Sequence, residues 1–291
     1  MKPFDCRAPA SLKEAIALLD EQDLRVRPTA NRTDLLVQLR AGRFDLERIV
    51  DLKRIPETNQ LSYDPIDGLT IGVAIPCCRI YEDRLIQVLY PALVDSASLI
   101  GSAPVQGGAM IGGNVCNAAP SGDSLPTLNV LGASCRIIGP RGERTVPIEQ
   151  FCTGPGTNVL ERGELLVFFR IPPRRPNSGA HYLRFITRNE MEISIVGVGA
   201  SIELSEDLTK IVSARIALGA VAPTPILVSE AGDFLRGKAP SQAVISQAAF
   251  LAREAASPIT DMRGSIPFRQ HLVGILAKRA LQGAIERARK N

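Results

Sequence analysis

A cluster of glycines near the middle of the chain is the clearest candidate for chemistry. Gly107, Gly108, Gly112 and Gly113 lie close together and are followed directly by Asn114. Glycine has no Cβ, so its backbone can approach a ligand closely, and successive N–H groups can form a concavity that suits a diphosphate. The spacing differs from the G-x-G-x-x-G that opens a Rossmann helix. The cluster predicts either a phosphate-binding loop or a glycine-rich turn that serves packing alone.

Polar side chains after the cluster extend this candidate site. Asn117 adds a second amide, and Asp123 adds a carboxylate that can accept hydrogen bonds from ligand hydroxyls. The density of glycine and proline predicts that residues 101–126 form neither a regular helix nor a central strand.

A second candidate is the loop-to-helix junction ANRTDLL at residues 30–36. The N–H groups of Thr33, Asp34 and Leu35 would be free at a helix N-terminus, a position that favours anions. The alternative is ordinary capping of that helix by Thr33 or Asp34. If both this junction and the glycine cluster bind phosphate, together they hold a long anionic ligand from two sides.

Composition excludes several other classes of protein. The 291 residues are 45% apolar and 22% charged, which is typical of a globular chain of about two domains. A net charge of +4, spread along the chain, indicates neither a nucleic-acid nor a membrane surface. Six cysteines without a C-x-x-C pair and two histidines predict no metal site. The absence of an apolar run of about 18 to 20 residues predicts no membrane span, and with the charged start it predicts a cytoplasmic protein.

The elements that must position these loops follow from apolar periodicity. Residues 11–20 predict an amphipathic helix that opens with a capping box of Ser11 and Glu14, and residues 24–30 predict a strand. A second helix follows and stops at Gly42. Short strands between residues 48 and 80 precede a helical stretch over residues 81–100.

The rest of the chain predicts an α+β arrangement. Residues 165–173 predict a strand that ends at a proline-rich linker, so we expect a domain boundary near residue 176. Beyond it, three strands followed by helices over residues 241–255 and 268–290 predict a sheet covered on one face.

Five motifs in order give the chain a family resemblance. They are RPTANRTDLLVQLRAG, MIGGNVCNAAPSGDSLP, FCTGPGTNVLERGELLVFFRIP, ALGAVAPTPIL and TDMRGSIPFRQHL. Together they resemble the FAD-binding medium subunit of molybdenum hydroxylases, the carbon monoxide dehydrogenase and xanthine dehydrogenase type enzymes, over essentially the whole chain.

The resemblance implies an α+β fold in two parts. Residues 1–176 are expected to form an FAD-binding domain of the para-cresol methylhydroxylase type, with two α/β subdomains at about 1–55 and 56–176. Residues 177–291 are expected to form the family's C-terminal α+β domain.

The resemblance also assigns cofactor-binding residues. It places the first flavin-diphosphate loop at Ala30, Asn31, Arg32, Thr33, Asp34 and Leu35, and the second at Ile111, Gly112, Gly113 and Asn114. The neighbouring Met110 and Asn117 are expected to line the same cofactor site. The resemblance places an acidic contact at Asp123 and a basic residue at Arg184. The strand residue that packs near the isoalloxazine matches Leu165 or Leu166. No catalytic residue and no metal ligand are assigned.

Two departures from the family's pattern affect the loops. Asn31 and Arg32 stand where the family has two glycines. Arg32 brings a long side chain into the approach, where it either obstructs the ligand or pairs with a phosphate. Met110 replaces a hydroxyl residue, which removes one hydrogen bond worth about 0.5 to 1.5 kcal/mol.

By resemblance, the chain is the electron-exit module of an oxidoreductase complex. Substrate oxidation at the molybdopterin of a large partner subunit would reduce the [2Fe-2S] clusters of a small one. The FAD of this chain would receive electrons from those clusters and pass them to NAD, a quinone carrier or oxygen. A dimer of heterotrimers is expected, with no nucleic acid and no membrane span. The alternatives are a self-sufficient flavin oxidoreductase and a scaffold subunit that binds flavin weakly or not at all.

Overall fold

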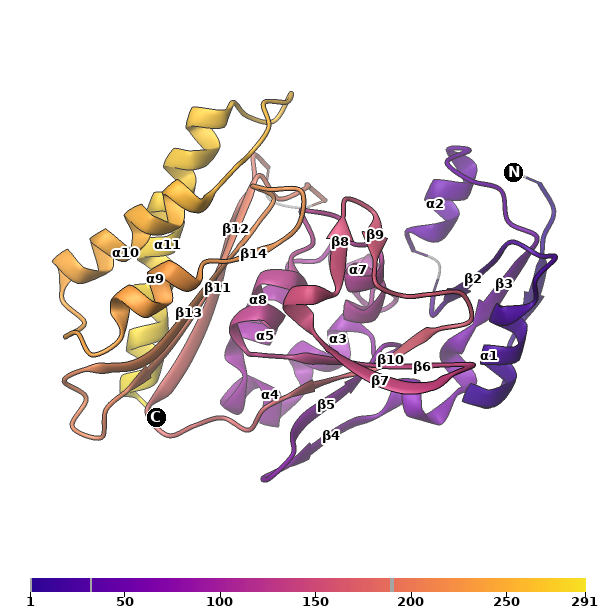
Figure 1. The fold of residues 1–291 in the computed structure, drawn as a ribbon, viewed down its shortest axis with the longest axis horizontal. Coiled ribbons are helices and arrows are strands. Elements are labelled where there is room, and N and C mark those ends of the chain that lie inside the picture. Colours follow the sequence, from indigo (N-terminus) through magenta and orange to yellow (C-terminus); the bar gives the residue numbers. More distant parts are fainter. Residues whose placement is uncertain (1, 32, 189–190) are drawn as a thin grey trace.

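The computed structural model describes residues 2–31, 33–188 and 191–291, in which three main sheets follow one another along the longest axis (Figure 1). The N-terminal sheet is parallel, in the order β1 (Asp5–Arg7), β3 (Arg48–Asp51), β2 (Val26–Thr29). Its helices are α1 (Leu12–Asp20) and α2 (Leu35–Arg40). Ser11 caps α1, as predicted, by accepting a hydrogen bond from the backbone N–H of Glu14.

The middle sheet is antiparallel throughout and carries the larger hydrophobic core. Its order is β4 (Leu61–Asp64), β5 (Gly68–Gly72), β10 (Leu165–Ile171), β6 (Ser134–Gly139), β7 (Gly142–Pro147). Two short strands, β8 (Cys152–Gly154) and β9 (Thr157–Asn158), form a hairpin between β7 and β10. Central β10 is almost fully buried, because both of its faces are covered.

Short helices connect β5 to β6 along the chain. They are α3 (Cys77–Glu82), α4 (Arg84–Leu89), α5 (Pro91–Ala97), α6 (Ala103–Gln106), α7 (Ile111–Cys116) and α8 (Ser124–Val130), with 3-10 turns at Leu52–Arg54, Pro56–Asn59 and Ile148–Gln150. The predicted helical stretch over residues 81–100 is therefore two full helices and the end of a third, interrupted at Asp83 and before Pro91.

The C-terminal sheet is antiparallel, in the order β11 (Ser178–Phe185), β12 (Val196–Leu204), β13 (Ile211–Gly219), β14 (Ile226–Leu227). Helices α9 (Ser229–Leu235), α10 (Gln242–Ala255) and α11 (Ile266–Arg289) follow it. The sequence predicted the helices over residues 241–255 and 268–290 but not α9.

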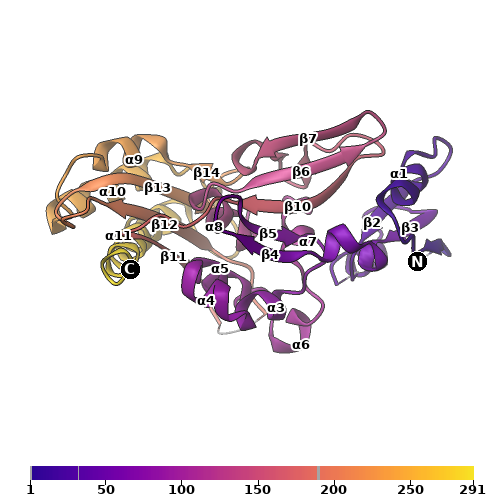
Figure 2. The same ribbon diagram turned by 90° about the horizontal axis from the view of Figure 1, so that it is seen from below.

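The prediction that only one face of this sheet is covered was wrong. Helix α11 packs on β11 and β12 from one side, while α5 and α8 contact the same sheet from the other. Figures 1 and 2 show the sheet between these two groups of helices. The backbones of β12 and α8 approach closely, since a Cβ at Gly199 would lie 2.8 Å from the carbonyl oxygen of Pro126 in α8.

An ion pair between α11 and α5 connects the C-terminal sheet and its helices to the rest of the chain. Arg287 of α11 donates two hydrogen bonds to the carboxylate of Asp95 in α5, at 2.6 and 2.9 Å. The same guanidinium also donates to the carbonyl oxygen of Ala180 at 2.7 Å. A bidentate pair fixes orientation as well as distance, so α11 and α5 are held in register.

Candidate functional site

The glycine cluster forms part of a helix, which the sequence analysis excluded. Helix α7 begins at Ile111 and contains both Gly112 and Gly113, and its first backbone hydrogen bond runs from the N–H of Asn114 to the oxygen of Met110. Two glycines disfavour a helix by about 1 kcal/mol each. Tertiary packing overrides this preference, because α7 lies directly against the middle sheet at a distance that only glycine permits.

The two adjacent glycines of α7 face different surroundings. A Cβ at Gly112 would lie 2.5 Å from both the carbonyl oxygen and the Cβ of Val73, which follows β5. A Cβ at Gly113 would meet no atom within 4 Å, and Gly113 is exposed. Gly112 is therefore required by the fold, whereas Gly113 leaves open space beside the first turn of α7, where amides precede the intrahelical bonds.

The first loop lies against the glycine cluster, as a two-sided site requires. The side chains of Asn31 and Thr33 both approach Gly108, and a Cβ there would lie 3.5 Å from the Thr33 Cγ2 atom. Ala30 is half-buried, Asp34 is exposed, and Leu35 begins α2. Arg32 lies outside the described residues.

Asp34 does not cap α2 with its side chain, so this part of the capping alternative is wrong. Asp34 occupies the N-cap position but has helical backbone angles and makes no side-chain capping bond. Its carboxylate instead accepts a hydrogen bond from the side chain of Gln38, one turn along the same helix. Gln38 also donates to Asn117 at 2.9 Å, which the sequence analysis missed because a polar residue on a short helix gives no distinct signal.

Asn114 joins α7 to the start of α8. Its side-chain oxygen accepts hydrogen bonds from the hydroxyl of Ser124, at 2.6 Å, and from the backbone N–H of the same residue, at 3.3 Å. This part of the amide therefore holds protein structure in place.

Asp123 and Arg184 meet in a buried cluster that links α8 to the C-terminal sheet. Asp123 accepts a hydrogen bond from Tyr182 at 2.7 Å and one from Arg184 at 2.6 Å, through different carboxylate oxygens. Burial raises the pKa of the Asp123 carboxyl, while Arg184 and Tyr182 oppose that shift. Burial and the adjacent carboxylate raise the pKa of Tyr182 well above its usual value. Both oxygens of Asp123 thus already have partners on β11.

Other predicted residues lie in the core. Leu165 and Leu166 are 2% and 1% exposed, so their side chains offer no surface to a flavin. Met110 and Ile111 are also buried, and Met110 pairs with Pro76 in an isolated β-bridge. Of these four residues, Met110 and Ile111 stay beside the candidate site through their backbone, at the start of α7.

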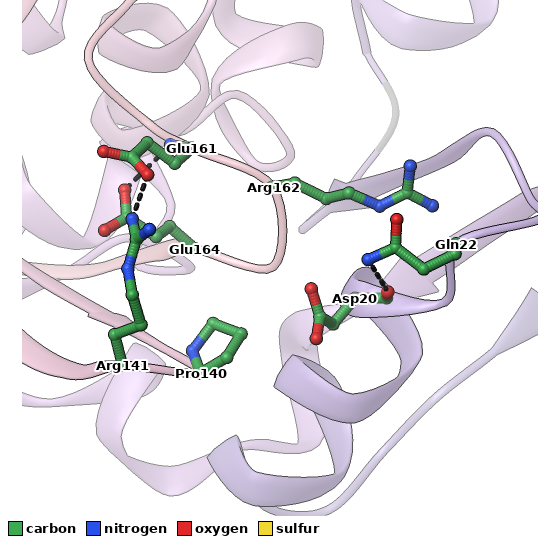
Figure 3. Close-up of a pocket in the computed structure, with 7 residues that line it drawn as sticks. All are labelled: Asp20, Gln22, Pro140, Arg141, Glu161, Arg162 and Glu164. Atoms are coloured by element: carbon green, nitrogen blue, oxygen red, sulfur yellow. Dashed lines mark hydrogen bonds and ion pairs between the residues drawn. The ribbon is translucent and has the colours of Figure 1, made fainter.

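A separate cavity of about 260 Å³ lies between the end of α1 and the loop before β10 (Figure 3). Its lining is charged, and the side chains of Arg141 and Glu161 turn toward one another as an ion pair. Arg162 extends toward the end of α1 and donates to the carbonyl oxygen of Glu21. Among the described residues, none of the predicted site residues lines this cavity.

The described part of the chain contains neither a membrane-spanning helix nor a cluster of metal ligands. None of its helices is long and apolar enough to cross a membrane. No group of three or more histidine, cysteine or acidic side chains in residues 2–31, 33–188 and 191–291 is arranged to hold a metal ion.

Comparison with known proteins decides the family. Residues 2–174 match the FAD binding domain in molybdopterin dehydrogenase, and residues 181–284 match the carbon monoxide dehydrogenase flavoprotein C-terminal domain. The chain belongs to the FAD-binding subunits of molybdenum hydroxylases. It is therefore a flavoprotein component of an oxidoreductase, as the resemblance implied.

Individual relatives align with this chain over at least 95% of their own lengths. The xanthine dehydrogenase FAD-binding subunit of Escherichia coli O157:H7 is 32% identical, with 96% of this chain and 95% of the relative covered. The carbon monoxide dehydrogenase medium chain of Afipia carboxidovorans is 29% identical over 98% of each. A chain of a Cu,Mo-carbon monoxide dehydrogenase crystal structure superposes with a TM-score of 0.93 at 28% identity, covering 99% of this chain and 100% of that one.

The different surroundings of Gly112 and Gly113 give a test of the geometry without any ligand. Gly112→Ala is expected to lower the free energy of unfolding by about 1 to 3 kcal/mol, the cost of overpacking against Val73. Gly113→Ala is expected to change it by less than about 1 kcal/mol, in the stabilising direction, because alanine favours a helix. Urea denaturation of the flavin-free proteins measures both values, and equal destabilisation by the two substitutions would contradict the placement of α7.

Proposed function

We propose that the chain holds the diphosphate of FAD between the first loop and the first turn of α7. The observation that carries this proposal is the contact between the two loops, combined with the open space beside Gly113. Backbone amides at Gly112 and Gly113 precede the intrahelical hydrogen bonds of α7 and suit a negatively charged group. The residues present therefore fit a dinucleotide, and FAD when bound there supplies reversible electron exchange.

The proposed site takes most of the residues expected from the sequence. It comprises Ala30, Asn31, Arg32, Thr33, Asp34, Leu35, Met110, Ile111, Gly112, Gly113, Asn114 and Asn117. Leu165 and Leu166 are left out because their side chains are buried. We assign Asp123 and Arg184 a structural role instead of direct flavin binding. Their ion pair holds the C-terminal sheet against α8 and so shapes the side of the flavin site that faces this sheet.

In the cell, the proposed role is electron transfer within a larger complex. The relatives are named as subunits or medium chains, which supports partner subunits for this chain. We infer a large molybdopterin subunit and a small [2Fe-2S] subunit, in a dimer of heterotrimers in the cytoplasm. Electrons would reach the FAD from the [2Fe-2S] clusters and leave to an external acceptor. The proposed domains are residues 1–176, divided near residue 55, and residues 177–291.

Gly113→Val tests the proposed diphosphate site. A Cβ at Gly113 would meet no protein atom within 4 Å, so the valine side chain is expected to occupy the ligand's space, and FAD retention is expected to be lost while the fold is kept. Gly274→Val in α11 is the matched control, since a Cβ there has only ordinary contacts with Arg253. Flavin content after gel filtration and circular dichroism of both variants measure the outcome. Normal flavin content in folded Gly113→Val protein would refute this placement.

The proposed place in a complex predicts that the flavin-loaded chain is inert alone. Xanthine, aldehydes or carbon monoxide are expected not to bleach the flavin absorbance of the isolated chain, whereas dithionite is expected to do so at once. Adding the large and small partner subunits is expected to restore bleaching by the substrate of the complex. Rapid bleaching by any of these substrates without partners would favour a self-sufficient oxidoreductase.

A further inference from the structure

The first loop and the glycine cluster touch through Asn31, one of the residues that depart from the family's pattern. A Cβ built on Gly108 would lie only 1.8 Å from the Nδ2 atom of Asn31 and 3.1 Å from its Cγ. The Asn31 amide therefore occupies the space that a side chain at position 108 would need. Gly107, the preceding residue, has no atom within 4 Å of the corresponding position.

A second contact joins the same two segments at their far ends. Gln38 lies on α2, immediately after the first loop, and Asn117 lies at the C-cap of α7. The Gln38 side chain donates to the Asn117 oxygen at 2.9 Å and to the carboxylate of Asp34. One side chain thus ties the start of α2 to the end of α7, across 79 positions of sequence.

We propose that Asn31 and Gln38 are positioning residues that hold the two flavin loops together before FAD binds. A loop with two glycines would have to be ordered at the moment of binding, at an entropic cost. In this chain, the Asn31 amide packed on Gly108 and the hydrogen bond from Gln38 to Asn117 fix the separation of the loops in the free protein. The asparagine that replaces a family glycine is therefore accommodated by Gly108.

This inference rests on the proposed flavin site, and Gly108→Ala tests it. The methyl group meets the end of a short side chain and no backbone, so the fold is kept while Asn31 is displaced. The dissociation constant for FAD, measured by fluorescence titration of the flavin-free full-length protein, is expected to rise about fivefold, as when one polar side chain must be ordered on binding. Gly107→Ala, the matched control, is expected to leave it unchanged.

Combining substitutions shows whether the effect acts through Asn31. Asn31→Gly alone is expected to weaken FAD about fivefold, because the contact is lost from the other side. In the double variant Asn31→Gly with Gly108→Ala, the added methyl has only Thr33 at 3.5 Å, so no further loss is expected. Gln38→Met is expected to weaken FAD separately, and its effect should multiply with that of Gly108→Ala.

The outcomes separate the inference from the proposed function. Failure of the wild-type protein to bind FAD would refute the proposed site itself. Normal binding by the wild type, with Gly108→Ala weakening FAD no more than Gly107→Ala, would overturn the inference and leave the site intact. Effects of Asn31→Gly and Gly108→Ala that multiply to about 25-fold would also overturn it, because independent sites add in free energy.

Discussion

The close approach of Gly112 to Val73 is the constraint on which the site depends. Val73 follows β5, and its N–H donates at 3.0 Å to the carbonyl oxygen of Val167 in central β10. Helix α7 therefore rests on the middle of the five-stranded sheet, with no room for a side chain at the point of contact. Because Gly112 faces the sheet, Gly113 faces open space, and one packing contact decides which amides a ligand can reach.

A chain of hydrogen bonds connects α7 to the C-terminal sheet. Asn114 of α7 binds Ser124, and neighbouring Asp123 pairs with Arg184 and Tyr182 on β11. A buried ion pair adds little net stability, since both charges lose their hydration, but it orients the groups that form it. The flavin loops and the C-terminal sheet are thus linked through a few residues at the start of α8.

The sequence predicted the parts whose signals are local. The capping box at Ser11, the proline-rich end of β10 and the long apolar face of α11 were all confirmed as elements. The family followed from five ordered motifs, which is information that no single glycine cluster contains.

The remaining features depend on contacts between distant segments. Helix α7 was missed because glycine disfavours a helix locally, and only the packing on Val73 reverses that preference. The contact between Asn31 and Gly108 joins residues far apart in the chain and leaves no signal in the sequence. The covering of the second face of the C-terminal sheet likewise depends on α5 and α8, which come from the earlier part of the chain. The sequence could not show that the side chains of Leu165 and Leu166 are buried, or that the Asp34 side chain leaves α2 uncapped, because both depend on packing and local geometry.

Hydrogen exchange with and without FAD tests the central claim most directly. If the diphosphate lies between the two loops, amide exchange should slow on FAD addition both at residues 33–35 and at residues 111–113. The flavin-free protein should already protect α7 from its first intrahelical bond at Asn114 onward. Unchanged exchange in both segments, with protection confined to the charged cavity beside Arg162, would contradict the account.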